Sequence, residues 1–191
     1  FMKQITFRSK RKNKTNKFVK ILSLLTIFFC YSSLVLAVSP NLQTPSPVIY
    51  LSDNLDEERN LGYCLDTRGR GFSERMHAHS CKPRGGDVQF VYKRESLQIR
   101  SATFDGKCVI VLGEVAAGSR FGLVDCTSKD KLQSFDYDEA TLEFRSSANK
   151  TLCISVGKES RRAGPFMARY LRLSICQSTK PKYKQWVILE K

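Results

Sequence analysis

A repeated stretch decides the fold of this chain: FVYKRESLQIRS at residues 90–101 recurs 45 positions later as FDYDEATLEFRS at residues 135–146. Each copy begins with two aromatic residues at alternate positions and ends in alternating apolar and polar residues. Leu97, Ile99 and Ser101 share one face of an extended chain, and Gln98 and Arg100 share the other. This alternation predicts a short β-strand in each copy, and a period of this length is typical of folds built from repeated units.

The N-terminal segment has the pattern of a targeting signal. Residues 1–20 contain eight basic and no acidic residues, and residues 21–38 are apolar and uncharged. This order predicts a secretory signal peptide at residues 1–37, cleaved between Ala37 and Val38. The apolar run also falls within the ~17–25 residues that span a bilayer, so the alternative is an uncleaved signal anchor. Both place the domain outside the cytosol, secreted or extracytoplasmic, with membrane contact only through such an anchor.

Six cysteines beyond this segment follow the same period. The gaps within successive pairs are 17, 18 and 23 residues, and the first members lie 44 and 45 residues apart. An even number of cysteines in a secreted chain implies disulfides, although six cysteines allow fifteen pairings. Only neighbour pairing treats three units alike. We therefore expect the bonds Cys64–Cys81, Cys108–Cys126 and Cys153–Cys176.

Short strands separated by Gly, Asp, Asn and Ser turns, without a long helical pattern, indicate an all-β fold. Single β units of this size cannot bury their apolar faces alone. We expect three repeats of about 45 residues to close on one another with pseudo-threefold symmetry. The predicted domain spans residues 48–191, behind a Pro-containing linker at residues 38–47.

These units resemble the ricin B-type β-trefoil lectin family. The first unit begins with Cys64-Leu65-Asp66, and the units end in a glutamine–aromatic motif: Gln89-Phe90, Gln133-Ser134-Phe135 and Gln185-Trp186. Only the second has the Gln-x-aromatic spacing of the family. The resemblance implies a β-trefoil in which Phe90, Phe135 and Trp186 belong to the core, whatever the domain binds.

The same resemblance implies that each unit can hold a sugar site. In the first unit it assigns Asp66 to accept hydrogen bonds from sugar hydroxyls, His79 to stack on the ring, and His77 and Asp87 to the positions beside them. The corresponding residues of the other units lack carboxylates: Ile110, Val124 and Leu132, then Ser155, Ser174 and Tyr183. We therefore expect one galactose-like site, which is weak because a histidine ring offers less stacking area than tryptophan.

A metal site and an enzyme are the competing interpretations of these residues. His77 and His79 lie on one face of a strand, and with Asp66 and Asp87 they form a donor set for a borderline metal ion. A His-x-His pair alone is a weak signal, and no Cys-x-x-Cys pair is present, so we expect no metal and no cofactor. Nor does the chain contain Gly-x-Ser-x-Gly, His-Glu-x-x-His or a phosphate-binding glycine loop, so we expect a non-catalytic domain.

Charge suggests the remaining partners. Removing the eight basic residues of the signal from the 32 in the chain leaves 24 basic against 18 acidic, a net charge of +6. We expect carbohydrate or glycoprotein glycans as partners, acidic polysaccharide among them, and no nucleic acid. The alternative function is a trefoil scaffold that has lost sugar binding and contacts protein or acidic glycans through basic loops. Asn149 begins an Asn-Lys-Thr glycosylation sequence.

Overall fold

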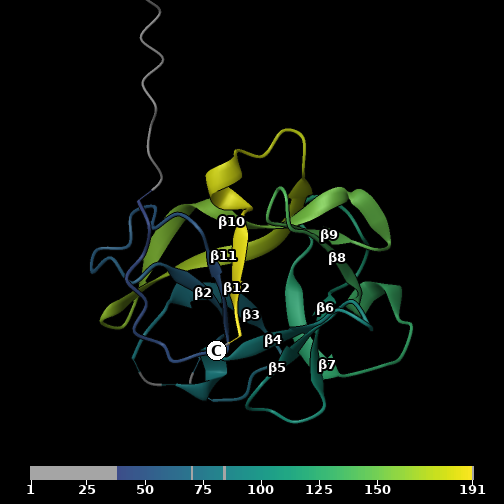
Figure 1. The fold of residues 1–191 in the computed structure, drawn as a ribbon, viewed down its shortest axis with the longest axis horizontal. Coiled ribbons are helices and arrows are strands. Elements are labelled where there is room, and N and C mark those ends of the chain that lie inside the picture. The colour runs from purple at the N-terminus through teal and green to yellow at the C-terminus, as the bar shows by residue number, and fades with distance from the viewer. Residues whose placement is uncertain (1–37, 70, 84, 191) are drawn as a thin grey trace, which may run out of the picture. The chain divides into compact units, whose positions relative to one another are not determined.

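The computed structural model of this chain describes residues 38–69, 71–83 and 85–190. The predicted signal or anchor at residues 1–37 lies outside the described residues. Within those ranges, no helix has the length and apolar character needed to cross a membrane. Strands dominate the described domain, which confirms the all-β prediction (Figure 1).

Short strands joined by turns make up the domain. In chain order they are β1 (Val48–Leu51), β2 (Tyr63–Thr67), β3 (Met76–Ser80), β4 (Phe90–Lys93), β5 (Gln98–Ser101), β6 (Lys107–Val111), β7 (Phe121–Asp125), β8 (Phe135–Asp138), β9 (Glu143–Ser146), β10 (Asn149–Ala163), β11 (Phe166–Ile175) and β12 (Trp186–Leu189). Three single 3₁₀ turns lie among the described residues: η1 (Gly86–Val88), η2 (Lys131–Gln133) and η3 (Pro181–Tyr183).

The strand pairing recurs along the chain in three units, with β1–β4 in unit one, β5–β8 in unit two and β9–β12 in unit three. The antiparallel hairpins β2–β3, β6–β7 and β10–β11 are each closed by one disulfide, and these bonds are the neighbour pairs that the cysteine spacing predicts. Short antiparallel pairs, β4–β5, β8–β9 and β12–β1, join one unit to the next. The last pair brings the end of the domain back to its beginning. The pseudo-threefold symmetry itself stays a prediction.

The aromatic residues that close the units lie in one core. Phe90, Phe135 and Trp186 are buried in a single apolar cluster. Tyr92 and Tyr137, which stand 45 residues apart, each donate a hydrogen bond of 2.8 Å from the phenol to the backbone of the next unit, at the carbonyls of Phe135 and Trp186. The repeated aromatic pair of the sequence therefore supplies both apolar area and a polar link between units.

The third hairpin is longer than the other two. β10 has 15 residues and β11 has 10, and the outer part of β11 pairs with β3, placing Ala168 opposite His79 and Arg169 opposite Ala78. This length accounts for the wider spacing of 23 residues between Cys153 and Cys176. The extra residues carry unit three across to unit one.

The segment predicted as a linker contacts unit one. Gln43 donates its backbone amide to the carbonyl of Cys81 at 3.3 Å, and the hydroxyl of Thr44 donates to the carbonyl of Lys82 at 2.6 Å. Gly62 has φ of +70°, and a Cβ atom there would stand 2.5 Å from Pro40. Only glycine fits this close approach.

Three equivalent residue pairs beside the disulfides are joined by three kinds of interaction. Each pair combines a position on the first strand of a unit with the position two residues before the closing aromatic residue. The pairs are Val48 with Val88, Gln98 with Gln133, and Glu143 with Lys184. The first is apolar and buried around Cys64–Cys81, the second is an amide hydrogen bond of 3.3 Å, and the third is a buried ion pair of 2.5 Å.

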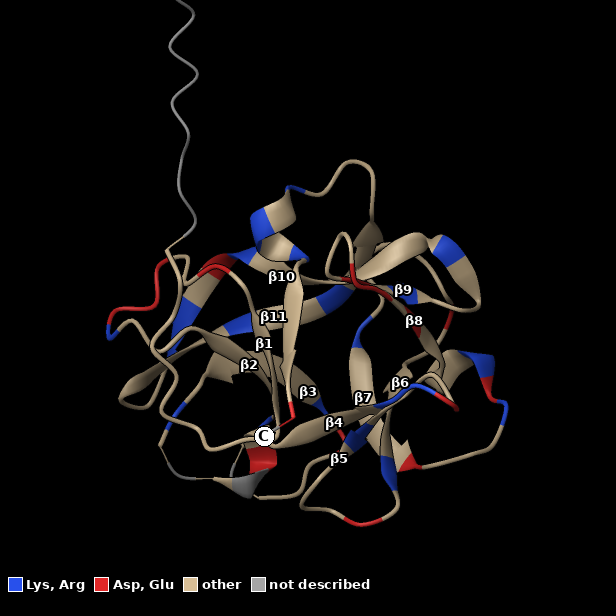
Figure 2. Cartoon of the chain, viewed as in Figure 1, with Lys and Arg blue, Asp and Glu red and all other residues tan. Residues whose placement is uncertain are grey.

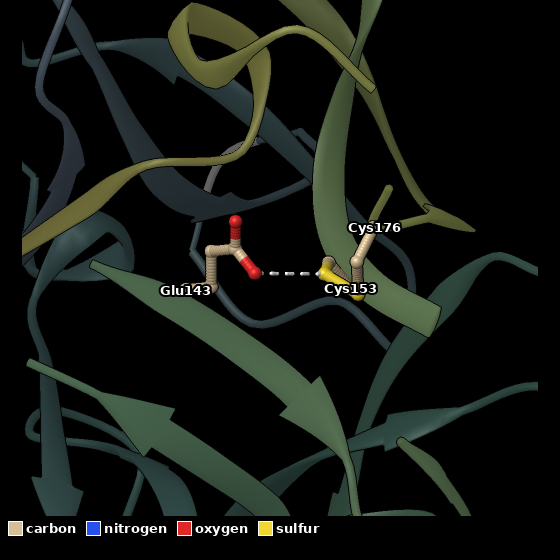
Figure 3. Close-up of side chains that lie close together, drawn as sticks. All are labelled: Glu143, Cys153 and Cys176. Carbon is tan, nitrogen blue, oxygen red and sulfur yellow. Dashed lines mark hydrogen bonds between the residues drawn. A yellow bond between two sulfur atoms is a disulfide. The ribbon is translucent and has the colours of Figure 1, made fainter. Parts of the chain in front are cut away.

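The ion pair of unit three lies against its disulfide. Figure 3 shows the Glu143 carboxylate beside Cys153 and Cys176, with the sulfur of Cys153 3.5 Å from Oε2. Carboxylate and sulfur are metal-ligand types, but the sulfurs are bonded to each other and offer no thiolate. Lys184 compensates the carboxylate, and its ammonium also donates to the carbonyl of Cys176 at 2.7 Å.

Removing one member of this pair is expected to cost more stability than removing both charges. Lys184→Gln leaves the buried carboxylate of Glu143 with only the partly exposed guanidinium of Arg145 as a counter-charge, at a cost on the order of 2 kcal/mol in the free energy of unfolding. The double variant Glu143→Gln/Lys184→Gln copies the Gln98–Gln133 pair and is expected to recover most of that loss. Urea unfolding, followed by the fluorescence of Trp186, measures both. Equal losses in the single and double variants would contradict this account.

Candidate functional site

A pocket of about 870 Å³ opens where units one and three meet. Its walls come from β3, the turn η1, the loop before β6 and the end of the β10–β11 hairpin. The lining includes three of the predicted site residues, His77, His79 and Asp87. The fourth, Asp66, is buried behind them, with its side chain 1% exposed and Oδ2 3.8 Å and 3.6 Å from ring nitrogens of His77 and His79. The structure thus brings all four residues together.

One lysine lies between the two carboxylates. The ammonium of Lys82 is 3.2 Å from Oδ2 of Asp66 and 2.9 Å from Oδ2 of Asp87. Its side chain is 14% exposed, against 1% for Asp66 and 5% for Asp87. Within the described residues, Oδ1 of each carboxylate has no hydrogen-bond partner. Lys82 therefore compensates two buried charges and leaves one acceptor oxygen free on each.

The charges around Lys82 determine its protonation. Burial alone lowers the pKa of a lysine, but the charge of Asp66 and the hydrogen bond and charge of Asp87 outweigh burial and raise the pKa of Lys82 above its ordinary value. The side chain is consequently an ammonium at neutral pH. Gly85 makes room for this arrangement, since a Cβ atom on it would stand 2.2 Å from Oδ1 of Asp87.

Hydrogen bonds assign different tautomers to the two histidines. An arginine can only donate, so the contact of 3.1 Å between Nη2 of Arg161 and Nδ1 of His77 makes this Nδ1 an acceptor and puts the ring proton on Nε2. Nδ1 of His79 lies 3.1 Å from the carbonyl of Ser80, which can only accept, so here the proton is on Nδ1. The neutral ring of His79 therefore keeps Nε2 as an acceptor.

Burial keeps the ring of His79 neutral. Removal from water lowers the pKa of His79 below its ordinary value of 6.5, although the charge of Asp66 opposes this shift. Protonation of this ring therefore requires a lower pH than protonation of a histidine exposed to water.

Aromatic residues that the sequence analysis did not assign also line the pocket. Phe104 and Phe166 are partly exposed there, and the ring of His79 meets Phe166 edge-on, with centroids 5.7 Å apart. Phe166 is the first residue of β11, in the extended part of the third hairpin. The wide spacing of Cys153 and Cys176 is the one sequence signal that points to this wall.

A polar cluster fixes that hairpin against unit one. Arg169, on β11, is buried and pairs with Asp56, and its guanidinium also donates to the carbonyl of Gly157 at 2.6 Å. Burial alone raises the pKa of Asp56, but hydrogen bonds from Ser160, Arg169 and Tyr63 lower it to about 2. The wall of the pocket is therefore held by a carboxylate that stays ionised well into the acid range.

The site does not fit a metal ion. Of the donor set considered from the sequence, both carboxylates already bind the ammonium of Lys82, and the two histidines lie beside Asp66. A cation at that position would be repelled by a charge already in place. Arg161 also uses Nδ1 of His77.

The glycosylation candidate lies apart from these residues. Asn149 is exposed at the start of β10, and its side-chain oxygen accepts a hydrogen bond of 2.7 Å from the hydroxyl of Thr151. Neither residue is part of the pocket lining. A glycan on Asn149 would therefore be attached outside the pocket lining.

Comparison with protein-family models identifies the family of this chain. The model of the ricin-type β-trefoil lectin domain matches residues 54–186, which includes the pocket and all three disulfides. The chain belongs to this family. Membership supports carbohydrate binding as the function class, and domains of this family are generally non-catalytic.

Solved structures support the fold of this lectin domain. The chain is similar to GalNAc-T7, solved with UDP, GalNAc and Mn²⁺, at a TM-score of 0.50 and 17% identity, over 80% of this chain and 23% of that one. It is also similar to the solution structure of the mdaA-1 domain, at a TM-score of 0.57 and 14% identity, over 81% of this chain and 98% of that one. At these identities the likeness concerns the fold alone. No curated protein sequence matches the chain.

The lowered pKa of His79 predicts an acid-sensitive lectin. Between 6.5 and the lower folded value, the unfolded chain binds more protons at this residue, up to one, than the folded chain. The free energy of unfolding is therefore expected to fall as the pH falls through this window, and to fall less in His79→Gln. NMR titration of the two histidine rings in the chain provides the direct measurement. A midpoint for His79 at or above 6.5 would refute the assignment.

Proposed function

We propose that this domain is a non-catalytic carbohydrate-binding module with one weak, galactose-like site in the pocket of unit one. The observation that carries the proposal is the pair of buried carboxylates, Asp66 and Asp87, each with an oxygen that has no hydrogen-bond partner within the described residues. Both oxygens are shielded from solvent. A sugar hydroxyl that displaces the side chains in front of them would supply the missing donor, and a bond to a charged acceptor is the stronger kind.

The other groups of the pocket suit the remaining parts of a sugar. Lys82 is an ammonium with three donors, of which Asp66 and Asp87 use two, and the third can serve a hydroxyl or ring oxygen. The partly exposed rings of Phe104 and Phe166, with His79 beside them, offer apolar area for the face of the ring. Sites with a few polar groups on an apolar wall are the usual form of small-ligand pockets.

The corresponding positions in unit three illustrate why we propose a single site. Ser155 stands where unit one has Asp66, and its hydroxyl is already bonded to Ser174 at 2.6 Å and to the carbonyl of Arg172 at 3.2 Å. Ile110 in unit two has no polar group at all.

A chain with one weak site gains useful avidity only when several copies are displayed together. We propose that it acts outside the cytosol, secreted or held by its N-terminal segment.

Replacing the buried carboxylate tests the site. Asp66→Ala, made in the full chain with its disulfides intact, is expected to reduce binding of galactose-terminated glycans at least tenfold, because the hydroxyls lose a charged acceptor. Asp66→Asn keeps the size of the side chain and is expected to weaken binding less severely. Isothermal calorimetry and a glycan array provide the measurements.

The matched control is Ser155→Ala, the equivalent position in unit three, which is expected to leave binding unchanged. Circular dichroism and the urea midpoint establish that each variant is folded. Unchanged sugar binding in folded Asp66→Ala and Asp66→Asn would disprove the site. If the wild-type chain bound no neutral sugar at any concentration tested, the proposed function would be wrong.

A further inference from the structure

A second hollow, of about 260 Å³, adjoins the pocket and is lined by four arginines. Arg68 and Arg75 flank the β2–β3 turn of unit one, Arg120 precedes β7 of unit two, and Arg161 lies on β10 of unit three. Figure 2 shows basic positions along β10 and β11, the strands that bring the third unit to this place. No carboxylate contributes to the described lining of the hollow. Positive charge from all three units thus gathers at one position.

These arginines are not balanced by acidic side chains. In the described part of the chain, the arginines that form salt bridges are Arg94, Arg145, Arg162 and Arg169. The four of the hollow are absent from this set. Like charges held close together destabilise a fold unless a counter-ion or ligand joins them. A bound anion would relieve this repulsion.

An aromatic ring orders part of the arginine cluster. The guanidinium of Arg120 lies 4.0 Å from the ring centroid of Tyr170, and that of Arg161 lies 5.9 Å from it. Tyr170 is nevertheless 51% exposed, so part of its ring stays open to a ligand. Guanidinium groups held by stacking lose less freedom when they bind an anion, and each presents a planar pair of donors to a sulfate or carboxylate.

The arginine hollow and the sugar pocket share part of their lining. Arg68, His77 and Arg161 line both of them. Arg161 is the link, because its guanidinium bonds to His77 in the pocket and lies near Tyr170 in the hollow. A ligand long enough to have a ring in the pocket therefore has its next substituent beside the arginines.

We infer that the ligand of this lectin is an anionic glycan, whose sulfate or carboxylate group binds in the arginine hollow while a neutral sugar ring occupies the pocket. This inference rests on the proposed function and names its substrate class. Asp87 in the lining and Asp66 behind it are acceptors that need hydrogen-bond donors, and the ionised phosphates of nucleic acid or of a phosphate-dense surface supply none. Only a molecule with hydroxyls at one end and an acidic group at the other suits both hollows.

The test compares one oligosaccharide in two forms. A galactose-containing tetrasaccharide with a sulfate, and the same tetrasaccharide after desulfation, are titrated into the full, disulfide-intact chain by calorimetry at low and high salt. We expect the sulfated form to bind about tenfold more tightly at low salt and the difference to shrink as salt screens the charges. Arg75→Gln/Arg120→Gln is expected to abolish this preference and to leave the affinity for the desulfated form unchanged, because neither arginine lines the sugar pocket.

The matched control removes the same charge elsewhere. Lys93→Gln/Lys180→Gln changes two exposed lysines outside both hollows and is expected to keep the preference. An equal loss in both double variants would mean general attraction by net charge and would overturn the inference, as would equal affinity of the wild type for the two forms. Tight binding of vesicles containing phosphatidylserine, without binding of either tetrasaccharide, would overturn it in favour of a membrane.

The design separates failure of this inference from failure of the proposed function. If the desulfated sugar binds and depends on Asp66, but sulfate adds nothing, only the inference fails. If sulfated sugar binds through the arginines and Asp66→Ala has no effect, the arginine hollow stands and the proposed sugar pocket fails.

Discussion

A single ammonium group shared by two buried carboxylates governs the candidate site. Asp66 and Asp87 are removed from water, and Lys82 is the cation that makes this burial tolerable. Lys82 follows the disulfide-bonded Cys81, and its carbonyl is held by Thr44, so covalent and hydrogen bonds fix the backbone that carries the charge. Stability and recognition therefore depend on the same three side chains, and a ligand hydroxyl can only add to a network that is already charged.

The pocket exists because the three units are unequal. The β10–β11 hairpin of unit three is longer than the β6–β7 hairpin of unit two. The longer β10–β11 hairpin continues, pairs with β3 and brings Phe166 and Arg161 over the residues of unit one. The repeated residues of the three units form the core, whereas the extra length of the third hairpin forms one wall of the site. The same departure concentrates arginines from three units at one place.

The sequence predicts those features that depend on local spacing. Alternation around Leu97 and Leu142 gives strands because side chains alternate across an extended backbone, and the period of the cysteines gives the disulfide pairing. Asp66, His77, His79 and Asp87 could be named because the resemblance to the ricin B-type family assigns positions around Cys64 and Cys81. Lys82 could not be assigned to the site from the sequence. A lysine that follows a cysteine resembles any exposed charge until the burial of Asp66 is known. Phe166 and Arg161 come from another unit, and only the tertiary path of the hairpin reveals them.

The three pairs beside the disulfides make the units respond differently to temperature. The cost of taking charges out of water falls on heating, because the hydration of ions carries a strongly unfavourable entropy. The ion pair between Glu143 and Lys184 therefore contributes more to stability in warm solution than in cold solution. The contact around Val48 and Val88 is hydrophobic and weakens on cooling. One repeated position thus supplies a cold-sensitive contact in one unit and a heat-tolerant contact in another.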